Sequence, residues 1–222
     1  YHRIFEHHRT ILYQMIPLFV DCSARRIVIF GGGTVAARKA AYFSGHADVT
    51  VVSRSFVPAF DGLTITRQER DLAAATATEL DPLINGAFLV IAAVSDPAIN
   101  NRIGRLCKAN GILFNNADGE PGDVVLPAVT GGEHYTIAIS THGASPAVAR
   151  FVREELEDEF PALDAMILLQ ERLRDALKKS EPEQRRRTVI LRDVLEDPMV
   201  WELLASDGEA AWENVKARYL HE

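Results

Sequence analysis

The chain has 222 residues, of which 47% are hydrophobic and 25% are charged, and its formal net charge is -7. This length allows one large domain or two modest ones, and the composition is that of a globular protein. No basic stripe indicates nucleic-acid binding, the acidic balance argues against an anionic membrane surface, and no apolar run has transmembrane length. We therefore expect neither nucleic acid nor a membrane as a partner.

Two cysteines, Cys22 and Cys107, are present, and no CxxC motif or Cys/His cluster accompanies them. We therefore expect no disulfide framework, no fixed metal site, and a reducing, cytoplasmic setting. Residues 1–14 lack the sustained apolar core of a signal peptide. We interpret them as an extension outside the fold, with a short helix as the alternative.

Strand and helix patterns alternate through the first half of the chain. Helical spacing indicates helices over about 34–44 and over 97–110, where Ile99, Ile103 and Leu106 share one side. Strands are expected at 25–30, 48–53, 63–69, 87–94 and 112–117. Strands that alternate with helices favour an α/β fold with a parallel sheet covered on both faces.

The second half of the chain has a different pattern. Two strand-like runs around GGEH within 123–140 indicate a hairpin. A helix is expected over 144–160, with Ser145 as its N-cap and Pro146 as its first helical residue. Residues 161–222 are typical of helices interrupted near SEPE and EDP, and their dense charge of both signs indicates solvated faces.

Three glycines separate the first strand from the first helix, and Gly31, Gly33 and Ala36 form the pattern GxGxxA there. In such a motif the first glycine allows a tight turn, and the second lets the backbone approach a pyrophosphate. The small third residue allows close packing of helix and strand, and the helix N-terminus offers free N–H groups to phosphates. The motif predicts a Rossmann-like dinucleotide-binding unit, with a plain structural turn as the alternative.

The position where an acid usually holds the cofactor's ribose is occupied by other residues. That acid normally lies about 20 residues beyond the glycines, where this chain has Ser53, Arg54 and Ser55. Ser55 or the backbone can meet a ribose, and Arg54 can meet a 2'-phosphate. NAD and NADP therefore both stay open on this reasoning, and an exposed loop charge is the plain alternative for Arg54.

Four segments occur in the order found in one known family. They are PLFVDCSARRIVIFGGGTVAARKA, LVIAAVSDPAINNRI, LFNNAD and AISTHGASPAVARFVRE. Over roughly residues 16–160 the chain resembles the precorrin-2 dehydrogenases of siroheme and cobalamin synthesis, and the resemblance is looser in the helical tail. The family includes stand-alone dehydrogenases, bifunctional dehydrogenase/ferrochelatases and the N-terminal half of trifunctional siroheme synthases.

The resemblance implies an activity and a domain plan. The family oxidises precorrin-2 to sirohydrochlorin with NAD, some members then insert Fe²⁺, and its members are homodimers. By this resemblance we expect a dinucleotide-binding domain over 15–122, a dimerisation region over 123–160 and a helical domain over 161–222. No methyltransferase module is expected within these residues.

Asp118 is the main catalytic candidate. It ends LFNNAD at the carboxyl end of an expected parallel strand, where open α/β sheets build their sites. The resemblance implies that this aspartate is needed for both dehydrogenation and chelation, and each step needs a general base to remove protons. The alternative is a strand-end aspartate that caps a turn with Gly119.

The resemblance also implies two pairs of cofactor contacts. Thr34 and Val35 match a contacting pair directly after the glycines, through their backbone amides. Arg54 and Ser55 match a second contacting pair after the second expected strand.

A third stretch, AAVSDPAIN, resembles a loop of the family near the nicotinamide. Asp96 is the cofactor-contact candidate there and Asn100 matches a following asparagine, whereas Val94 stands where the family often has threonine. Asp96 is equally suited to be the N-cap of the helix that Pro97 begins, and both roles can hold together.

The substrate of this family carries many carboxylates, so its pocket needs cations. Arg38, Lys39, Arg150 and Arg153 are candidates because guanidinium groups bind carboxylates well, and ordinary helix-surface charge is the alternative for each. His142 is a lone histidine in a glycine-containing loop, and we interpret it as structural rather than as a metal ligand.

Two other functions remain as alternatives to the enzyme. One is a dimeric module that senses NAD(H), which the glycine motif alone would serve equally well. The other is a dehydrogenase of another small substrate, although no separate catalytic His or Tyr/Lys pair is evident. Residues 112–146 distinguish these hypotheses, because a sensor needs no carboxylate beside the nicotinamide.

Overall fold

The computed structural model describes residues 15–220, and the predicted extension of residues 1–14 lies outside them. The chain divides into two compact units between Leu126 and Pro127. None of the helices in the described part is long and apolar enough to cross a membrane. The domain boundaries predicted after residues 122 and 160 stay predictions.

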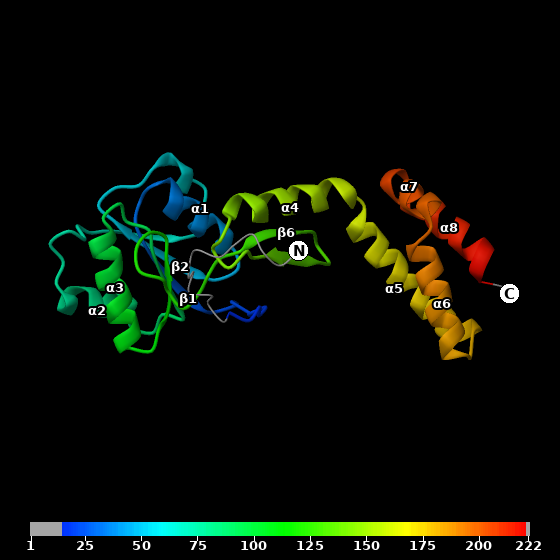
Figure 1. Cartoon of the computed structure of the whole chain (residues 1–222), viewed down its shortest axis with the longest axis horizontal. Coiled ribbons are helices and arrows are strands. Elements are labelled where there is room, and N and C mark those ends of the chain that lie inside the picture. Colours follow the sequence, from blue (N-terminus) through cyan, green and yellow to red (C-terminus); the bar gives the residue numbers. More distant parts are fainter. Residues whose placement is uncertain (1–14, 221–222) are drawn as a thin grey trace, which may run out of the picture. The chain divides into compact units, whose positions relative to one another are not determined.

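The first unit contains a five-stranded sheet that is parallel throughout (Figure 1). Across the sheet the strands lie in the order β3 (Thr66–Glu69), β2 (Asp48–Ser53), β1 (Arg26–Phe30), β4 (Leu89–Ala92) and β5 (Leu113–Asn116). The chain builds outward from β1 to one edge and then crosses to the other side of β1. This arrangement confirms the predicted α/β, Rossmann-like fold, and it creates the strand-order reversal at which such sheets bind ligands.

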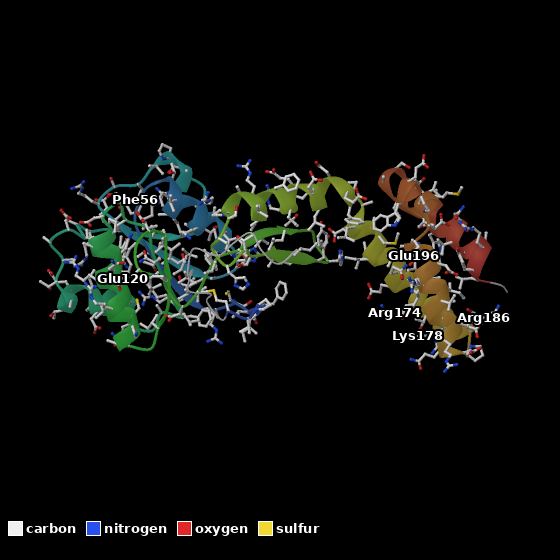
Figure 2. All side chains as sticks on the ribbon, viewed as in Figure 1. Phe56, Glu120, Arg174, Lys178, Arg186 and Glu196 are labelled. Atoms are coloured by element: carbon white, nitrogen blue, oxygen red, sulfur yellow. The ribbon has the colours of Figure 1, made fainter. Side chains whose placement is uncertain are left out.

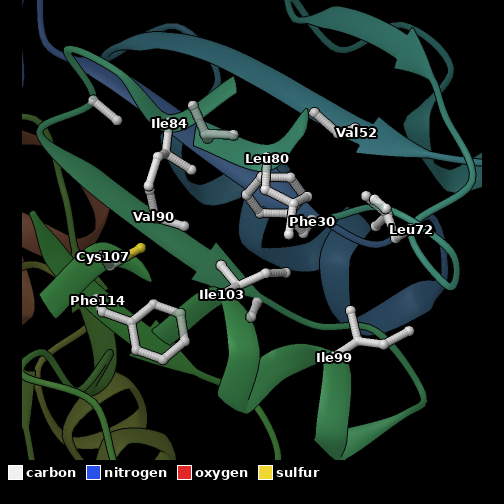
Figure 3. Close-up of a cluster of buried hydrophobic side chains, with 14 residues drawn as sticks. Phe30, Val52, Leu72, Leu80, Ile84, Val90, Ile99, Ile103, Cys107 and Phe114 are labelled. Carbon is white, nitrogen blue, oxygen red and sulfur yellow. The ribbon is translucent and has the colours of Figure 1, made fainter. Parts of the chain in front are cut away.

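One face of the sheet packs against α2 (Ala77–Ile84) and α3 (Pro97–Ala109). Phe30 of the central strand lies in this cluster with Leu80 and Ile103, and all three side chains are fully buried (Figure 3). Alternate residues of a strand point to opposite faces, so Ile27 and Ile29 belong to the other face. Both faces are therefore covered, as the continuous apolar run of the strand predicts.

The second face packs against α1 (Thr34–Phe43), with a short 3₁₀ turn η1 (Pro58–Phe60) beside it. Three alanines of the helix, Ala36, Ala37 and Ala40, are buried there. These small side chains let the helix approach the sheet closely, which brings its N-terminus to the carboxyl end of β1. The predicted role of Ala36 as the small residue of the glycine motif agrees with this packing.

Helix α2 was not predicted, although a local signal for it exists. Its N-terminus is a capping box in which the Thr76 amide donates to Glu79 Oε2 at 2.8 Å. Pro82 within the helix and a threonine- and alanine-rich start hide its periodicity. The predicted helices over 34–44 and 97–110 are confirmed to within a residue at each end.

The second unit begins with the predicted hairpin, formed by antiparallel β6 (Ala128–Gly131) and β7 (Thr136–Ile139). Helix α4 (Pro146–Glu159) follows, and Ser145 Oγ accepts from the Val148 amide at 3.3 Å, which confirms the predicted N-cap. Asp164 lies in the helix that follows α4 and links that helix to the hairpin turn. Its carboxylate accepts from the amides of Glu133 and His134 at 2.7 and 2.8 Å.

Four more helices follow in the described residues: α5 (Leu163–Ser180), α6 (Gln184–Leu195), α7 (Pro198–Ser206) and α8 (Gly208–Tyr219). Their shared core is apolar and includes Met166, Leu173 and Trp212. The breaks predicted at SEPE and EDP are confirmed, and a further break at Asp207 was not predicted. Charged side chains of α5 and α6 face outward, as the labelled side chains in Figure 2 illustrate.

Candidate active site

A cavity of about 670 Å³ lies at the carboxyl edge of the five-stranded sheet. Each of the five strands contributes residues at or shortly after its carboxyl end. The lining residues are Gly31–Val35 after β1, Ser53 at the end of β2 with Arg54, Ser55 and Val57 after it, Asp71–Ala73 after β3, Ala93–Asp96 and Ile99 after β4, and Ala117 and Asp118 after β5. This volume is typical of small-molecule and cofactor sites.

All eight residues that the sequence assigned to catalysis or to cofactor contact line this one cavity. They are Gly31, Gly33, Thr34, Val35, Arg54, Ser55, Asp96 and Asp118. They come from four strand ends that are far apart in the chain, and the parallel sheet gathers these ends at one edge. The residues therefore share a site, while the role of each stays a prediction.

The two glycines of the motif meet different surroundings. Gly31 has φ +127°, and a Cβ there would overlap the carbonyl oxygen of Ala93, the residue directly after the neighbouring strand β4. A Cβ on Gly33 would meet no atom within 4 Å. Gly31 is therefore required by the turn itself, whereas Gly33 leaves open space where a pyrophosphate can approach.

The glycine between them, Gly32, was given no role by the sequence reasoning. A Cβ on it would overlap the backbone carbonyl oxygen of Ser55, and its own carbonyl oxygen accepts from the Val57 amide at 2.9 Å. The turn after β1 therefore packs directly on the segment after β2. The extra glycine between the two of the motif was the signal for this contact, but the motif does not say which segment lies against it.

The N-terminus of α1 is prepared to receive an anion. Its N-cap, Gly33, makes no side-chain cap, and no acidic residue stands in the first turn. In α3 and α4, by contrast, Asp96 and Ser145 satisfy the corresponding amides. The first-turn amides of α1 and the positive end of its dipole therefore face the cavity without a side-chain partner among the described residues, an arrangement that suits phosphate.

Asp71 is a cavity residue that the sequence reasoning missed. Strand β3 pairs with β2 so that Glu69 lies beside Ser53, and the Arg70 amide donates to the Ser53 carbonyl oxygen at 3.0 Å. Two residues further on, Asp71 follows β3 as Ser55 follows β2, and both line the cavity. Asp71 Oδ1 accepts from the Ala73 amide at 2.9 Å. An acid is thus present beside β2 although β2 itself ends without one.

Asp96 and Asp118 stand at the other end of the cavity. Asp96 Oδ1 accepts from the Ala98 amide at 2.8 Å, so the N-cap role is confirmed and the cofactor contact stays a prediction. Asp118 is exposed, and its backbone is held by Asn116 and Asn100. Within residues 15–220 no group donates a hydrogen bond to the Asp118 carboxylate, so it is available to a substrate.

The four predicted substrate-binding cations do not line this cavity. Arg150 donates to Glu154 at 2.7 Å, and Arg153 forms ion pairs with Glu154 and Glu157. Lys39 Nζ donates to Asn115 Oδ1 at 2.9 Å, and burial lowers the pKa of its ammonium group. Arg38 is exposed.

His142 lies in the second unit and is exposed, with φ +53°. Among the described residues, no group of three or more His, Cys, Asp or Glu side chains could hold a metal ion.

Comparison with known proteins gives consistent results for both units. A family described as "Putative NAD(P)-binding" matches residues 18–128, and one described as "Sirohaem biosynthesis protein central" matches 136–159. The chain is 44% identical to a precorrin-2 dehydrogenase of Methanosarcina barkeri over 91% of this chain and 92% of that protein. It is 35% identical to a siroheme synthase of Nitrosospira multiformis over 88% of this chain, but it spans 42% of that protein's length.

The solved structure of SirC, a precorrin-2 dehydrogenase, is similar in fold. The TM-score is 0.67 at 20% sequence identity, and the match covers 91% of this chain and all of the other. At this identity the likeness establishes the fold alone.

Proposed function

Because the chain belongs to the precorrin-2 dehydrogenase family, we propose that it oxidises precorrin-2 to sirohydrochlorin with NAD in siroheme synthesis. The balanced reaction converts precorrin-2 and NAD⁺ into sirohydrochlorin, NADH and a proton. The observation that carries this proposal is that Asp118 and the glycine turn line the same cavity. A carboxylate beside a dinucleotide site is what an oxidation needs and what a sensor of NAD(H) does not.

Different residues of the cavity bind the cofactor and accept the proton. NAD, when bound, supplies the hydride acceptor. Gly33, Thr34 and Val35 hold the pyrophosphate through backbone amides, because the N-terminus of α1 lacks a side-chain cap. The Asp118 carboxylate takes the proton that the substrate loses as a general base.

We assign NAD rather than NADP on the basis of Asp71. A carboxylate beside the end of β2 accepts hydrogen bonds from ribose hydroxyls and repels a 2'-phosphate. Arg54 lines the same cavity and favours the opposite preference. Asp71→Asn should therefore raise kcat/KM with NADP relative to NAD, measured with both cofactors at fixed precorrin-2. Asp61→Asn is the control, because that exposed carboxylate pairs with Arg67 outside the cavity. An unchanged ratio in Asp71→Asn would remove this argument for NAD.

Insertion of Fe²⁺ into sirohydrochlorin is the second candidate activity. Metal insertion must remove pyrrole protons, and Asp118 offers a base in the same cavity. Fe²⁺ is then a substrate.

A homodimer is supported by the surface of α4. Val148, Phe151 and Val152 are 51%, 59% and 37% exposed and lie on one side of the helix. The neighbouring sheet has two strands, which is marginal for a sheet without further cover. Phe151→Glu should therefore shift the mass measured by light scattering toward the monomer. Val189→Glu, at an exposed position of α6, should leave the mass unchanged. A monomeric parent protein would contradict the dimer.

A reducing compartment, the cytoplasm, agrees with the state of both cysteines. Cys22 and Cys107 are free, and burial, with a smaller contribution from the charge of Asp123, raises the pKa of the Cys107 thiol to about 12.

The decisive experiment is an anaerobic assay of the parent protein and two variants. Precorrin-2 and NAD are supplied with and without Fe²⁺ or Co²⁺, and the absorption spectrum is followed. Asp118→Ala should bind NAD like the parent and oxidise precorrin-2 at least about 100-fold more slowly. Asp123→Ala is the control, because this exposed aspartate lies outside the cavity.

Each outcome of this assay has a separate meaning. Metallation that is faster than in the enzyme-free control would establish the second activity, and equal metallation would leave a dedicated dehydrogenase. Parent-like turnover in Asp118→Ala would overturn its role. No oxidation with either NAD or NADP would favour the sensor.

A further inference from the structure

We propose that Asn100, Asn101 and Asn116 form an amide clamp that positions Asp118 for the reaction. This inference rests on the proposed function, because it assigns the clamp a role through the Asp118 carboxylate. The three asparagines are positioning residues, since their described hydrogen bonds are made to backbone atoms and to one another.

Asn100 links the segments that follow two neighbouring strands. Its side chain is fully buried, and its Oδ1 accepts from the Val94 amide at 3.0 Å. Its Nδ2 donates to the carbonyl oxygens of Val94 and Asp118 at 3.0 and 3.1 Å. The donors of the amide are therefore both used, and a buried side chain with a full set of partners holds its neighbours in one arrangement.

Asn116 and Asn101 hold the other side of the same segment. The Asp118 amide donates to Asn116 Oδ1 at 3.2 Å. Asn116 Nδ2 donates to the Glu120 carbonyl oxygen at 2.6 Å and to Asn101 Oδ1 at 3.1 Å. Asn101 Oδ1 also accepts from the Glu120 amide at 2.8 Å. Side-chain amides thus bind the N–H and C=O groups of both Asp118 and Glu120.

Gly119 shows how closely the clamp surrounds this backbone. It has φ +126°, and a Cβ on it would overlap Asn101 Oδ1. The chain turns immediately after Asp118 and runs on to Glu120, which Figure 2 labels. An aspartate on an exposed loop would ordinarily sample many positions, but here its Cα is held while its carboxylate makes no described hydrogen bond. The clamp therefore restricts the position of the carboxylate but leaves its oxygens free to accept hydrogen bonds from a substrate.

The clamp also couples Asp118 to the cofactor side of the cavity. Val94, which Asn100 holds through both of its backbone groups, lines the cavity beside Asp96. Rate depends steeply on the distance and angle between a base and the reacting atom, so a loss of about 1 Å in placement is enough for about a 100-fold effect. A positioning role predicts a fall in kcat that exceeds any change in cofactor affinity.

The test compares kcat for precorrin-2 oxidation with the Kd for NAD in three full-length variants. Asn100→Ala should lower kcat at least about tenfold and change Kd less than about threefold. Asn116→Ala, at a half-buried position that should tolerate truncation, should lower kcat severalfold. Asn110→Ala is the control, because Asn110 lies at the C-terminus of the same helix and bonds Asp81 and Leu106. It should keep the parent kcat.

A double-mutant cycle separates positioning from a general structural role. If the clamp acts through Asp118, adding Asn116→Ala to Asp118→Ala should not lower the residual rate further. A further fall of the same size as in the parent background would overturn the clamp. A parent-like kcat in both Asn100→Ala and Asn116→Ala would overturn it as well.

These outcomes are distinguishable from failure of the proposed function. If Asp118→Ala is inactive and the asparagine variants turn over like the parent, the clamp alone is wrong. If Asp118→Ala itself turns over like the parent, the proposed role of Asp118 is wrong and the clamp falls with it.

Discussion

The unit that carries the cavity and the bundle of α5–α8 stabilise their interiors with different chemistry. In the first, Asn100 and Asn115 are buried and hydrogen-bonded to backbone oxygens. In α5–α8, every buried side chain is apolar, and the charged groups pair at the surface, as Arg172 does with Glu209.

This difference predicts how each part responds to change. A buried amide left without its partner costs about 1–3 kcal/mol, and its hydrogen bonds fix direction as well as distance. Apolar packing resists loss of volume but specifies direction less strictly. Exposed ion pairs contribute little to stability. We therefore expect the cavity unit to be sensitive to small local changes, and the bundle to be sensitive mainly to cavities in its core.

The largest effect on stability is expected from the core of the bundle. Leu173 is fully buried, so Leu173→Ala should lower the free energy of unfolding of the bundle by about 2–5 kcal/mol. Hydrogen exchange of the α5–α8 amides in denaturant measures this loss. Leu168 lies on the same helix and is 46% exposed, so Leu168→Ala is the control and should lose much less. Similar losses in both variants would contradict the apolar core as the source of stability.

The adjacent glycines should separate stability from cofactor binding. Gly32→Ala drives a Cβ into the Ser55 carbonyl and should destabilise the protein by about 1–3 kcal/mol or more. Gly33→Ala has open space and should keep the parent stability. It should weaken NAD binding by about tenfold, which corresponds to about 1.4 kcal/mol. Calorimetry measures both quantities, and undiminished NAD affinity in Gly33→Ala would refute the pyrophosphate site.

A smaller, pH-dependent effect is expected where the hairpin joins α5. Hydrogen bonds from the amides of Glu133 and His134 hold the pKa of the Asp164 carboxyl below its usual value. A lowered pKa in the folded state stabilises the protein above the usual carboxyl value of about 3.9, and this contribution is lost as the pH falls through the folded-state pKa.

Amide exchange of Glu133 and His134 measures this loss as a function of pH. The His134 ring also lies 3.4 Å from Asp164, so the parent and Asp164→Asn are compared over the same acid pH range. Asp164→Asn should remove the acid-range dependence. Identical profiles in the parent and the variant would exclude Asp164 as its source.

The smallest effect is expected at the surface of the bundle. Arg192 and Glu196 are 75% and 60% exposed, so Arg192→Met should leave Tm unchanged within error. Asp197, the partner of Arg218, is only 14% exposed and also caps α7. Arg218→Met should therefore lower Tm measurably. A larger fall in Arg192→Met than in Arg218→Met would reverse the ranking by exposure.

Much of the fold was predictable because its signals are local. The strand at 48–53 was predicted at its observed bounds, and the helix that begins at Pro97 was predicted with its cap, Asp96. Helix α2 was missed because Pro82 and weakly apolar residues obscure its period, although Thr76 and Glu79 form a capping box. The break at Asp207 was missed because no proline marks it. Asp207 alone caps the helix that follows.

The site divides in the same way. The residues that the sequence singled out follow strand ends or begin a helix, and these positions are recognisable one segment at a time. Asp71 was missed because it follows the short strand β3, and no local sequence pattern predicts the register of β3 with β2. The contact of Gly32 with Ser55 was missed although the run of three consecutive glycines was visible.

The sequence by itself determined the strand, glycine turn and helix of the dinucleotide site and the position of Asp118 at a strand end. Backbone preferences and capping act over a few residues, so they can be read directly from the chain. Only the tertiary structure decided that Asp71 lies beside the end of β2 and that Asn100 bonds the Asp118 carbonyl. Both depend on the lateral order of the strands, which is settled by the packing of apolar faces across the whole sheet.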